Sequence, residues 1–158
     1  MDLNNFLISG FKFVLSKTPN FAYNVQKVQM PGINLGTANV PTPFTQIPLP
    51  GNIAYEDLSI EFMVAESLVD YLEIFNWIVR MGQPVQFGQQ EVPFRNNMTD
   101  ASLVMMNSAS RPMLEAKFYD LYPTNLSGLN FDTTVNGTQY VSATANFKFL
   151  RYDIAPYT

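Results

Sequence analysis

The sequence predicts a mainly β protein, an antiparallel β-sandwich or partly open barrel with one packed α-helix. Three observations lead to this class. Several short segments alternate apolar and polar residues, as half-buried strands do. One segment changes to the period of an amphipathic helix. Asn136-Gly137, a strong hairpin signal, separates two stretches of strand character. We expect about seven strands in a single domain spanning residues 1–158.

The N-terminal part contains two expected strands and a long proline-rich loop. Residues 11–15 (FKFVL) and 21–29 (FAYNVQKVQ) flank a turn signal, which predicts a β-hairpin. Residues 31–51 hold five of the eleven prolines and lie within an uncharged stretch. Because proline lacks an N–H donor and fixes φ, we expect a loop there, with short extended pieces such as Thr45–Leu49.

The middle of the chain contains one strand and the expected helix. Residues 58–64 (LSIEFMV) alternate cleanly, which predicts a strand with one apolar face. The period then changes over residues 67–81, where Ser67 and Asp70 form a variant capping box and Gly82 ends the helix. The positions expected to pack on the sheet are Leu68, Tyr71, Leu72, Phe75, Ile78 and Val79.

The C-terminal part is expected to be entirely β. Residues 101–107 and 114–122 form one predicted strand pair. Residues 129–135 and 138–152 flank Asn136-Gly137 and form a second pair. The apolar face of the last strand contains Val141, Ala143, Ala145, Phe147 and Phe149.

Composition argues against catalysis and against a membrane span. The chain has no histidine and no cysteine, so it lacks the usual general base and the commonest metal ligands. No apolar run approaches the roughly 20 residues of a membrane helix, and the N-terminus has no secretory signal pattern. Charged residues make up 14% of the chain, against about 25% in a typical domain. This deficit favours a surface covered by other subunits, so we expect a structural protein without cofactor.

An uninterrupted acidic cluster is the main candidate for chemistry. No lysine or arginine lies among its members, which are Glu56, Asp57, Glu61, Glu66, Asp70 and Glu73. Carboxylates of this kind form a solvated or pore-facing acidic surface, or hold a cation or a carbohydrate. The nine basic residues are scattered, which argues against a nucleic-acid grip. The first interpretation is preferred, and a carboxylate-based carbohydrate- or cation-binding β-sandwich stays as an alternative.

Three stretches and the order of elements carry a resemblance to a known family. They are DLYPTNLSGLNFD (residues 120–132), ATANFKFLRYDI (residues 143–154) and VQMPGINLG (residues 28–36). An N-terminal hairpin, a long loop, a strand, one helix and a C-terminal β segment follow in that order. The chain resembles the tail tube protein family of contractile-tailed bacteriophages.

The resemblance implies a structural subunit that forms hexameric rings, with strands of neighbours joined into a barrel and the rings stacked. It also implies that the loop after the second strand reaches into the next ring. We therefore select, as candidate contacts between rings, Pro41, Pro43, Phe44, Ile47 and Pro48. It supplies no catalytic, metal-binding or cofactor-binding residues.

The resemblance further implies a lumen that passes DNA or holds a tape-measure protein. An acidic lumen repels phosphates, so DNA would pass without specific binding. The candidate lumen-facing residues are Glu56, Asp57 and Glu61. The implied partners are copies of the chain and other tail proteins such as sheath, baseplate or tape measure, without membrane insertion, in a virion tail assembled in the host cytoplasm.

Two related functions remain as alternatives. The proline content of residues 31–51 exceeds that expected of a generic repeating subunit, which leaves a tube-initiator, baseplate or neck ring as an alternative. A tube subunit of a bacterial contractile injection system would have the same fold.

Overall fold

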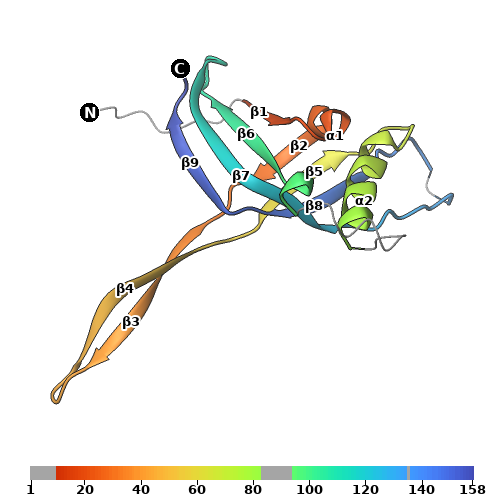
Figure 1. The fold of residues 1–158 in the computed structure, drawn as a ribbon. Coiled ribbons are helices and arrows are strands. Elements are labelled where there is room, and N and C mark those ends of the chain that lie inside the picture. Colours follow the sequence, from red (N-terminus) through yellow and green to blue (C-terminus); the bar gives the residue numbers. More distant parts are fainter. Residues whose placement is uncertain (1–9, 83–93, 135) are drawn as a thin grey trace.

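The structure is a computed structural model that describes residues 10–82, 94–134 and 136–158. Its body is one twisted antiparallel sheet with a helix packed against it (Figure 1). Neighbouring strands pair in the order β1 (Gly10–Leu15), β6 (Thr99–Met106), β7 (Pro112–Leu126), β8 (Ser142–Lys148), β5 (Leu58–Met63) and β2 (Val25–Gln29). A further strand, β9 (Arg151–Pro156), pairs with β7. The expected mainly β, antiparallel fold with a packed helix is confirmed, and β1, β2 and β9 each pair with one strand only and leave one edge open.

The N-terminal hairpin expected from the sequence does not form. β1 pairs with β6, β2 pairs with β5, and a short helix, α1 (Pro19–Tyr23), separates them. Proline is favourable in the first turn of a helix because its missing N–H is not needed there. Phe21 of α1 is fully buried, with its ring 4.8 Å from that of Phe62. Burial of this aromatic ring therefore outweighs the alternation that suggested a strand.

The core lies between the sheet and its two packed helices, α1 and α2. Alternate residues of β5 and β8 supply its centre, as the sequence pattern predicts. Phe147 of β8 has ring contacts with Phe21 and Trp77, so one aromatic side chain joins the sheet to both helices. Among the described residues, the fully buried apolar side chains are Leu15, Leu58, Ile60, Phe62, Phe21, Ile74, Ala116, Phe118, Leu121, Ala145 and Phe147.

The expected helix forms, but its buried face coincides only in part with the predicted one. Helix α2 spans Val69–Gly82 and buries Asp70, Ile74 and Trp77. The Trp77 indole N–H donates to the carbonyl of Asn97, 2.7 Å away, at the end of the short helix α3 (Phe94–Asn97). The prediction is wrong for Leu68, Leu72 and Phe75, which are exposed, because Trp77 occupies the inward side of the helix. Tyr71 and Ile78 of the predicted face are partly buried and pack against the core.

Asp70 is a fully buried carboxylate at the start of α2. Its Oδ2 accepts from the Asn24 side-chain amide at 3.0 Å and from the Ala65 backbone N–H at 2.9 Å. Its Oδ1 accepts from the Tyr71 N–H at 2.8 Å. An acidic group in the first turn also complements the helix dipole. This residue fastens the end of α1 to the start of α2, so for Asp70 the expectation of a solvated acidic surface is wrong.

The C-terminal β region is divided differently from the prediction. The Asn136-Gly137 turn lies within the connection between β7 and β8, which are paired antiparallel. The described residues from 127 to 141 form no strand, and the expected long last strand is split into β8 and β9. Its apolar face is confirmed by burial of Ala143, Ala145 and Phe147. Across the described residues, no helix has the length and apolarity needed to span a membrane.

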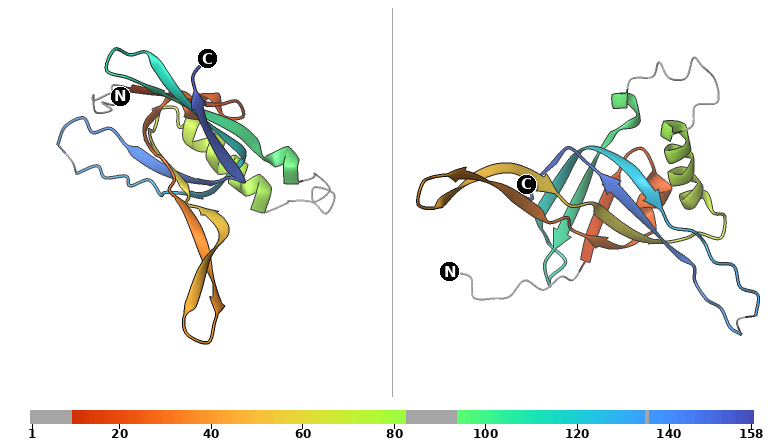
Figure 2. Two further views of the ribbon diagram at one scale, coloured as in Figure 1. Left: turned by 90° about the vertical axis from the view of Figure 1, so that its left-hand side faces the viewer. Right: turned by 90° about the horizontal axis from the view of Figure 1, so that it is seen from below.

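The segment expected to be a loop is a long β-hairpin that projects from the body (Figures 1 and 2). Strands β3 (Ile33–Pro41) and β4 (Gln46–Tyr55) pair only with each other. Each strand therefore has one open edge, where a proline without an N–H breaks no ladder hydrogen bond. A bulge interrupts the register between Leu35 and Thr37. A Cβ atom on Gly51 would lie 2.9 Å from the Gly36 carbonyl oxygen, so this crossing requires glycine.

Candidate assembly interface

The tip of the hairpin is a four-residue turn closed by two threonines. The Thr42 N–H donates to the Thr45 carbonyl at 3.0 Å, and the Thr45 N–H donates to the Thr42 hydroxyl at 3.1 Å. The Thr42 hydroxyl in turn donates to the Thr45 carbonyl. Pro43 and Phe44 lie between them, and the Phe44 side chain is 98% exposed. The turn therefore presents an aromatic ring to solvent on a hydrogen-bonded support.

The hairpin brings together all the residues selected as candidate contacts between rings. Pro41 pairs with Gln46, Ile47 pairs with Val40, and Pro48 pairs with Asn39. Together with Pro43 and Phe44 at the tip, the five selected residues are exposed and lie in the outer half of the hairpin.

The residues selected from the sequence include only part of the apolar surface of the hairpin. Besides Phe44 and Ile47, its large exposed apolar residues are Ile33, Leu35, Val40, Leu49 and Ile53. None of the buried core residues in the described part of the chain comes from β3 or β4. An exposed apolar surface of this extent is typical of a protein–protein contact. The uncharged stretch was the signal for it, but only strand pairing shows which side chains are exposed together.

The root of the hairpin is fixed to the body by hydrogen bonds and an aromatic cluster. The Tyr152 hydroxyl donates to the Pro31 carbonyl at 3.1 Å. The Glu56 N–H donates to the Gly32 carbonyl at 3.0 Å, while the Gly32 N–H donates to the Glu56 carboxylate at 3.2 Å. Tyr55 adds ring contacts to Phe149 and Tyr152. These contacts fix the direction in which the hairpin leaves the body.

Tyr152→Phe is expected to loosen the root of the hairpin without unfolding the body. The substitution leaves the ring contacts in place and removes the only hydrogen bond of the Tyr152 hydroxyl in the described structure. We expect a loss of about 0.5–1.5 kcal/mol in unfolding free energy. Exchange of the Gly32 and Ile33 amide hydrogens should also become faster. Tyr140→Phe, on a side chain that is 78% exposed, is the matched control. Equal effects of the two variants would contradict the proposed role of Tyr152.

The structure separates the three candidate lumen-facing carboxylates. Glu56 binds the Gly32 backbone at the root of the hairpin. Asp57 is exposed between β4 and β5. Glu61 lies on the face of β5 opposite the buried residues, where Lys27 of β2 and Thr144 of β8 are its neighbours in register. That a lysine lies beside Glu61 could not be predicted, because residues 27 and 61 are far apart in the chain.

The remaining members of the acidic cluster do not form a site either. Glu73 accepts from the Asn20 amide at 2.7 Å and from the Phe21 N–H at 3.1 Å, so it supports α1. Asp70 is buried at the start of α2. Within the described residues, no group of three or more acidic side chains is arranged to hold a metal ion.

The polar face of the sheet lies on the opposite side from the core. Along β5 and β8 it carries small hydroxyl and amide side chains, with Ser59 paired to Asn146 and Glu61 paired to Thr144. The adjoining strands add Lys27 and Thr124. A face of this composition offers no catalytic nucleophile with a partnering base. The polar side chains of this face are suited to contact with water.

Comparisons with known proteins agree with this architecture. A family model described as phage tail tube protein matches residues 7–155. No curated protein sequence matches the chain significantly. Among solved structures, the chain is similar to the anti-feeding prophage tube-terminating cap, with TM-score 0.67, 16% identity, and coverage of 99% of this chain and 96% of the other.

Two other assemblies contain similar folds. A chain in the extended sheath–tube complex of an extracellular contractile injection system has TM-score 0.65 and 14% identity, with coverage of 98% and 94% of this chain and the other. A chain in the anti-feeding prophage baseplate has TM-score 0.64 and 14% identity, with coverage of 92% and 90%. These likenesses show the fold. The family match covers nearly the whole sequence and describes structural tube proteins rather than enzymes, and this chain therefore belongs to the phage tail tube protein family.

Proposed function

We propose that the protein is a structural subunit that forms hexameric rings stacked into a phage tail tube. The single observation that carries this proposal is the long apolar hairpin, which projects from the body with no covering contact in the described structure. Exposed apolar surface of this kind is a hazard for a lone molecule and is stabilising when a neighbour covers it. The open edges of β1 and β2 add unpaired backbone groups that closure into a ring would satisfy.

The outer half of the hairpin is the proposed contact between rings. Its paired strands are stiffened by proline, so docking costs little conformational entropy. They carry no charged side chain, so no unpaired charge is buried between subunits. The contact residues in this proposal are Pro41, Pro43, Phe44, Ile47 and Pro48.

The polar face of β5 and β8 is the proposed wall of the lumen. Of the three candidate carboxylates, Glu61 lies on this face, while Glu56 and Asp57 lie at the root of the hairpin. Net charge −4 disfavours adhesion of phosphates, so DNA is expected to pass without specific binding. Sheath, baseplate and tape-measure proteins are the other proposed partners, in a virion tail assembled in the host cytoplasm.

A tube, terminator or baseplate ring of a contractile injection system is the second candidate. The observation that favours it is the similarity of the fold to chains in anti-feeding prophage cap and baseplate assemblies. These likenesses concern the fold alone, so they do not separate a phage tail from an injection system.

Electron microscopy of concentrated purified protein, and of particles produced by the parent genome, tests the proposal. We expect rings or tubes with six-fold symmetry, and antibody labelling along the tail of a virion or at one end of it. Labelling along the length indicates the repeating tube subunit, and labelling at one end indicates an initiator or terminator ring. A monomer at all concentrations that is also absent from assembled particles would contradict the proposal.

A further inference from the structure

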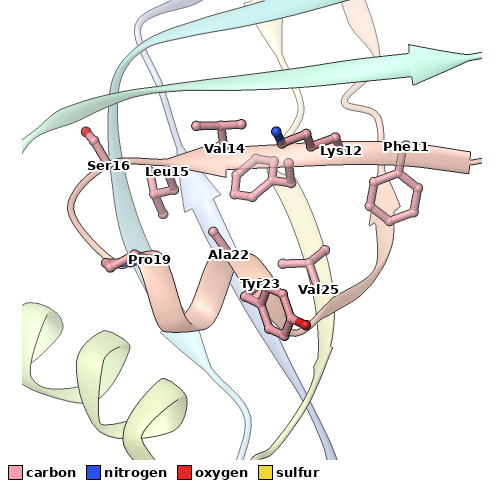
Figure 3. Close-up of a pocket in the computed structure, with 10 residues that line it drawn as sticks. Phe11, Lys12, Val14, Leu15, Ser16, Pro19, Ala22, Tyr23 and Val25 are labelled. Carbon is pink, nitrogen blue, oxygen red and sulfur yellow. The ribbon is translucent and has the colours of Figure 1, made fainter. Parts of the chain in front are cut away.

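The described structure contains an apolar groove (Figure 3) beside β1 and α1, which lie far from the tip of the hairpin (Figure 1). It lies between β1 and the segment formed by α1 and the start of β2, and it has a volume of ≈ 420 Å³. This size is at the lower end of the range for sites that enclose a bound group. Phe11 and Leu15 line one side, and Ala22, Tyr23 and Val25 line the other.

The groove is suited to an uncharged apolar group. Lys12 is the one charged residue in its lining, and Figure 3 shows its amine pointing away from α1. A charged occupant would lose its water without gaining a partner of opposite sign deep in the groove. Tyr23 is 89% exposed at the rim, where a large aromatic ring gains contact area from a docking partner.

The hairpin tip carries a group of matching chemistry. Phe44 is almost entirely exposed, is held by the Thr42–Thr45 turn, and lies in a stretch without charge from residue 28 to residue 55. The hairpin leads away from β1 and α1, so the tip of a chain is remote from the groove of the same chain (Figure 1). An occupant from the hairpin must therefore come from another copy.

A contact between two different patches has a consequence for assembly. When the tip of one copy binds the groove of the next, each molecule keeps one free tip and one free groove. Such head-to-tail contacts do not saturate in a dimer and instead generate rings or filaments. Each chain also supplies one tip and one groove, so every site in a long assembly can be filled.

We propose that Phe44 of one copy inserts into the groove between β1 and α1 of a second copy. The inference deepens the proposed function and rests on it, because both require copies of this chain to meet. It assigns a specific receptor to the hairpin tip, with Phe11, Ala22, Tyr23 and Val25 as its contacting residues.

Cysteine trapping tests this contact directly because the natural chain has no cysteine. The full-length Pro43→Cys, Tyr23→Cys double variant, which keeps the Phe44 side chain, is oxidised under assembly conditions and run on a non-reducing gel. We expect a ladder of covalent oligomers that is clearly stronger than that from either single variant. Pro43→Cys with Leu150→Cys, a residue that is 66% exposed outside the groove, is the matched control.

The competing occupant is the connection between β7 and β8, which carries Tyr140, a side chain that is 78% exposed. Tyr140→Cys with Tyr23→Cys tests it in the same assay. A ladder from this pair and none from the Pro43–Tyr23 pair would overturn the proposal. If samples that contain tubes give no ladder with any pair, the proposed Phe44 contact is wrong, whereas the proposed function is unaffected. Absence of rings and tubes from the wild-type protein counts against the proposed function itself.

Phe44→Ala supplies a test that needs no crosslink. The side chain is exposed, so the thermal unfolding midpoint should not change, whereas the protein concentration needed for assembly should rise roughly thirtyfold or more. Phe44→Trp should restore assembly. Ala22→Trp, which fills the groove from the other side, should reproduce the loss. Unchanged assembly of Phe44→Ala would overturn the proposal.

Discussion

Removal of the outer half of the hairpin is expected to abolish stacking of rings while the domain stays folded. A deletion of residues 38–49 leaves Thr37 and Pro50, which are paired in the register, to be joined through an inserted Asn-Gly turn. The deleted residues contribute no buried core side chain, so we expect a change of about 1 kcal/mol or less in unfolding free energy. Sedimentation and electron microscopy measure the assembly, and thermal unfolding measures the fold.

A second variant distinguishes the hairpin surface from its backbone. Val40→Ser with Ile47→Ser keeps the ribbon and removes two apolar side chains that are paired across it. We expect it to weaken stacking in the same direction as the deletion. Leu150→Ser, at an exposed apolar residue of the body, is the control. A deletion variant that is unfolded would show that the hairpin supports its own domain, and one that still stacks would exclude the hairpin as the contact between rings.

Asp70→Ala is expected to have the largest effect of any single substitution on stability considered for this protein. It removes a fully buried carboxylate and leaves the Ala65 N–H, the Asn24 amide and the Tyr71 N–H without this acceptor. A buried donor that loses a charged acceptor costs about 1.5–3 kcal/mol, and three donors are affected here. We therefore expect a loss of about 3 kcal/mol or more, measured by chemical denaturation at constant pH.

Two further variants test the role of Asp70. Asp70→Asn keeps one acceptor oxygen and should lose less stability than Asp70→Ala. Asp57→Ala, at an exposed carboxylate of the same cluster, should change unfolding free energy by less than about 0.5 kcal/mol. Equal effects of Asp70→Ala and Asp57→Ala would contradict the structural role assigned to Asp70.

Two predictions about local structure could be made from the sequence because their signals are local. The alternation in residues 58–64 defines β5 with Leu58, Ile60 and Phe62 inward, and the structure buries all three. The change of period at residue 67 predicts α2 to within two residues at its start and one at its end, since it is observed from Val69 to Gly82. Charge-free composition likewise selected the segment that forms the hairpin.

The partner of each strand was decided by the tertiary structure. Residues 21–29 have the composition of a strand that would pair with β1. Phe21 instead packs in the core against Phe62, and only residues 25–29 form a strand, which pairs with β5. The inward face of α2 is set in the same way, by the fit of Trp77 rather than by the wider apolar stripe. Both outcomes depend on side chains distant in sequence, which a local period does not contain.

The sequence by itself determined that this protein is mainly β, lacks histidine and cysteine chemistry, and has one long segment suited to contact with other subunits. The tertiary structure decided that this segment is a paired ribbon with Phe44 at its tip, that Asp70 is buried, and that Glu61 lies beside Lys27. The physical reason is the same in each case. Composition and periodicity are properties of neighbouring residues in the chain. Exposure, hydrogen bonding and the neighbours of a charge depend on which strands, distant in sequence, pair with each other.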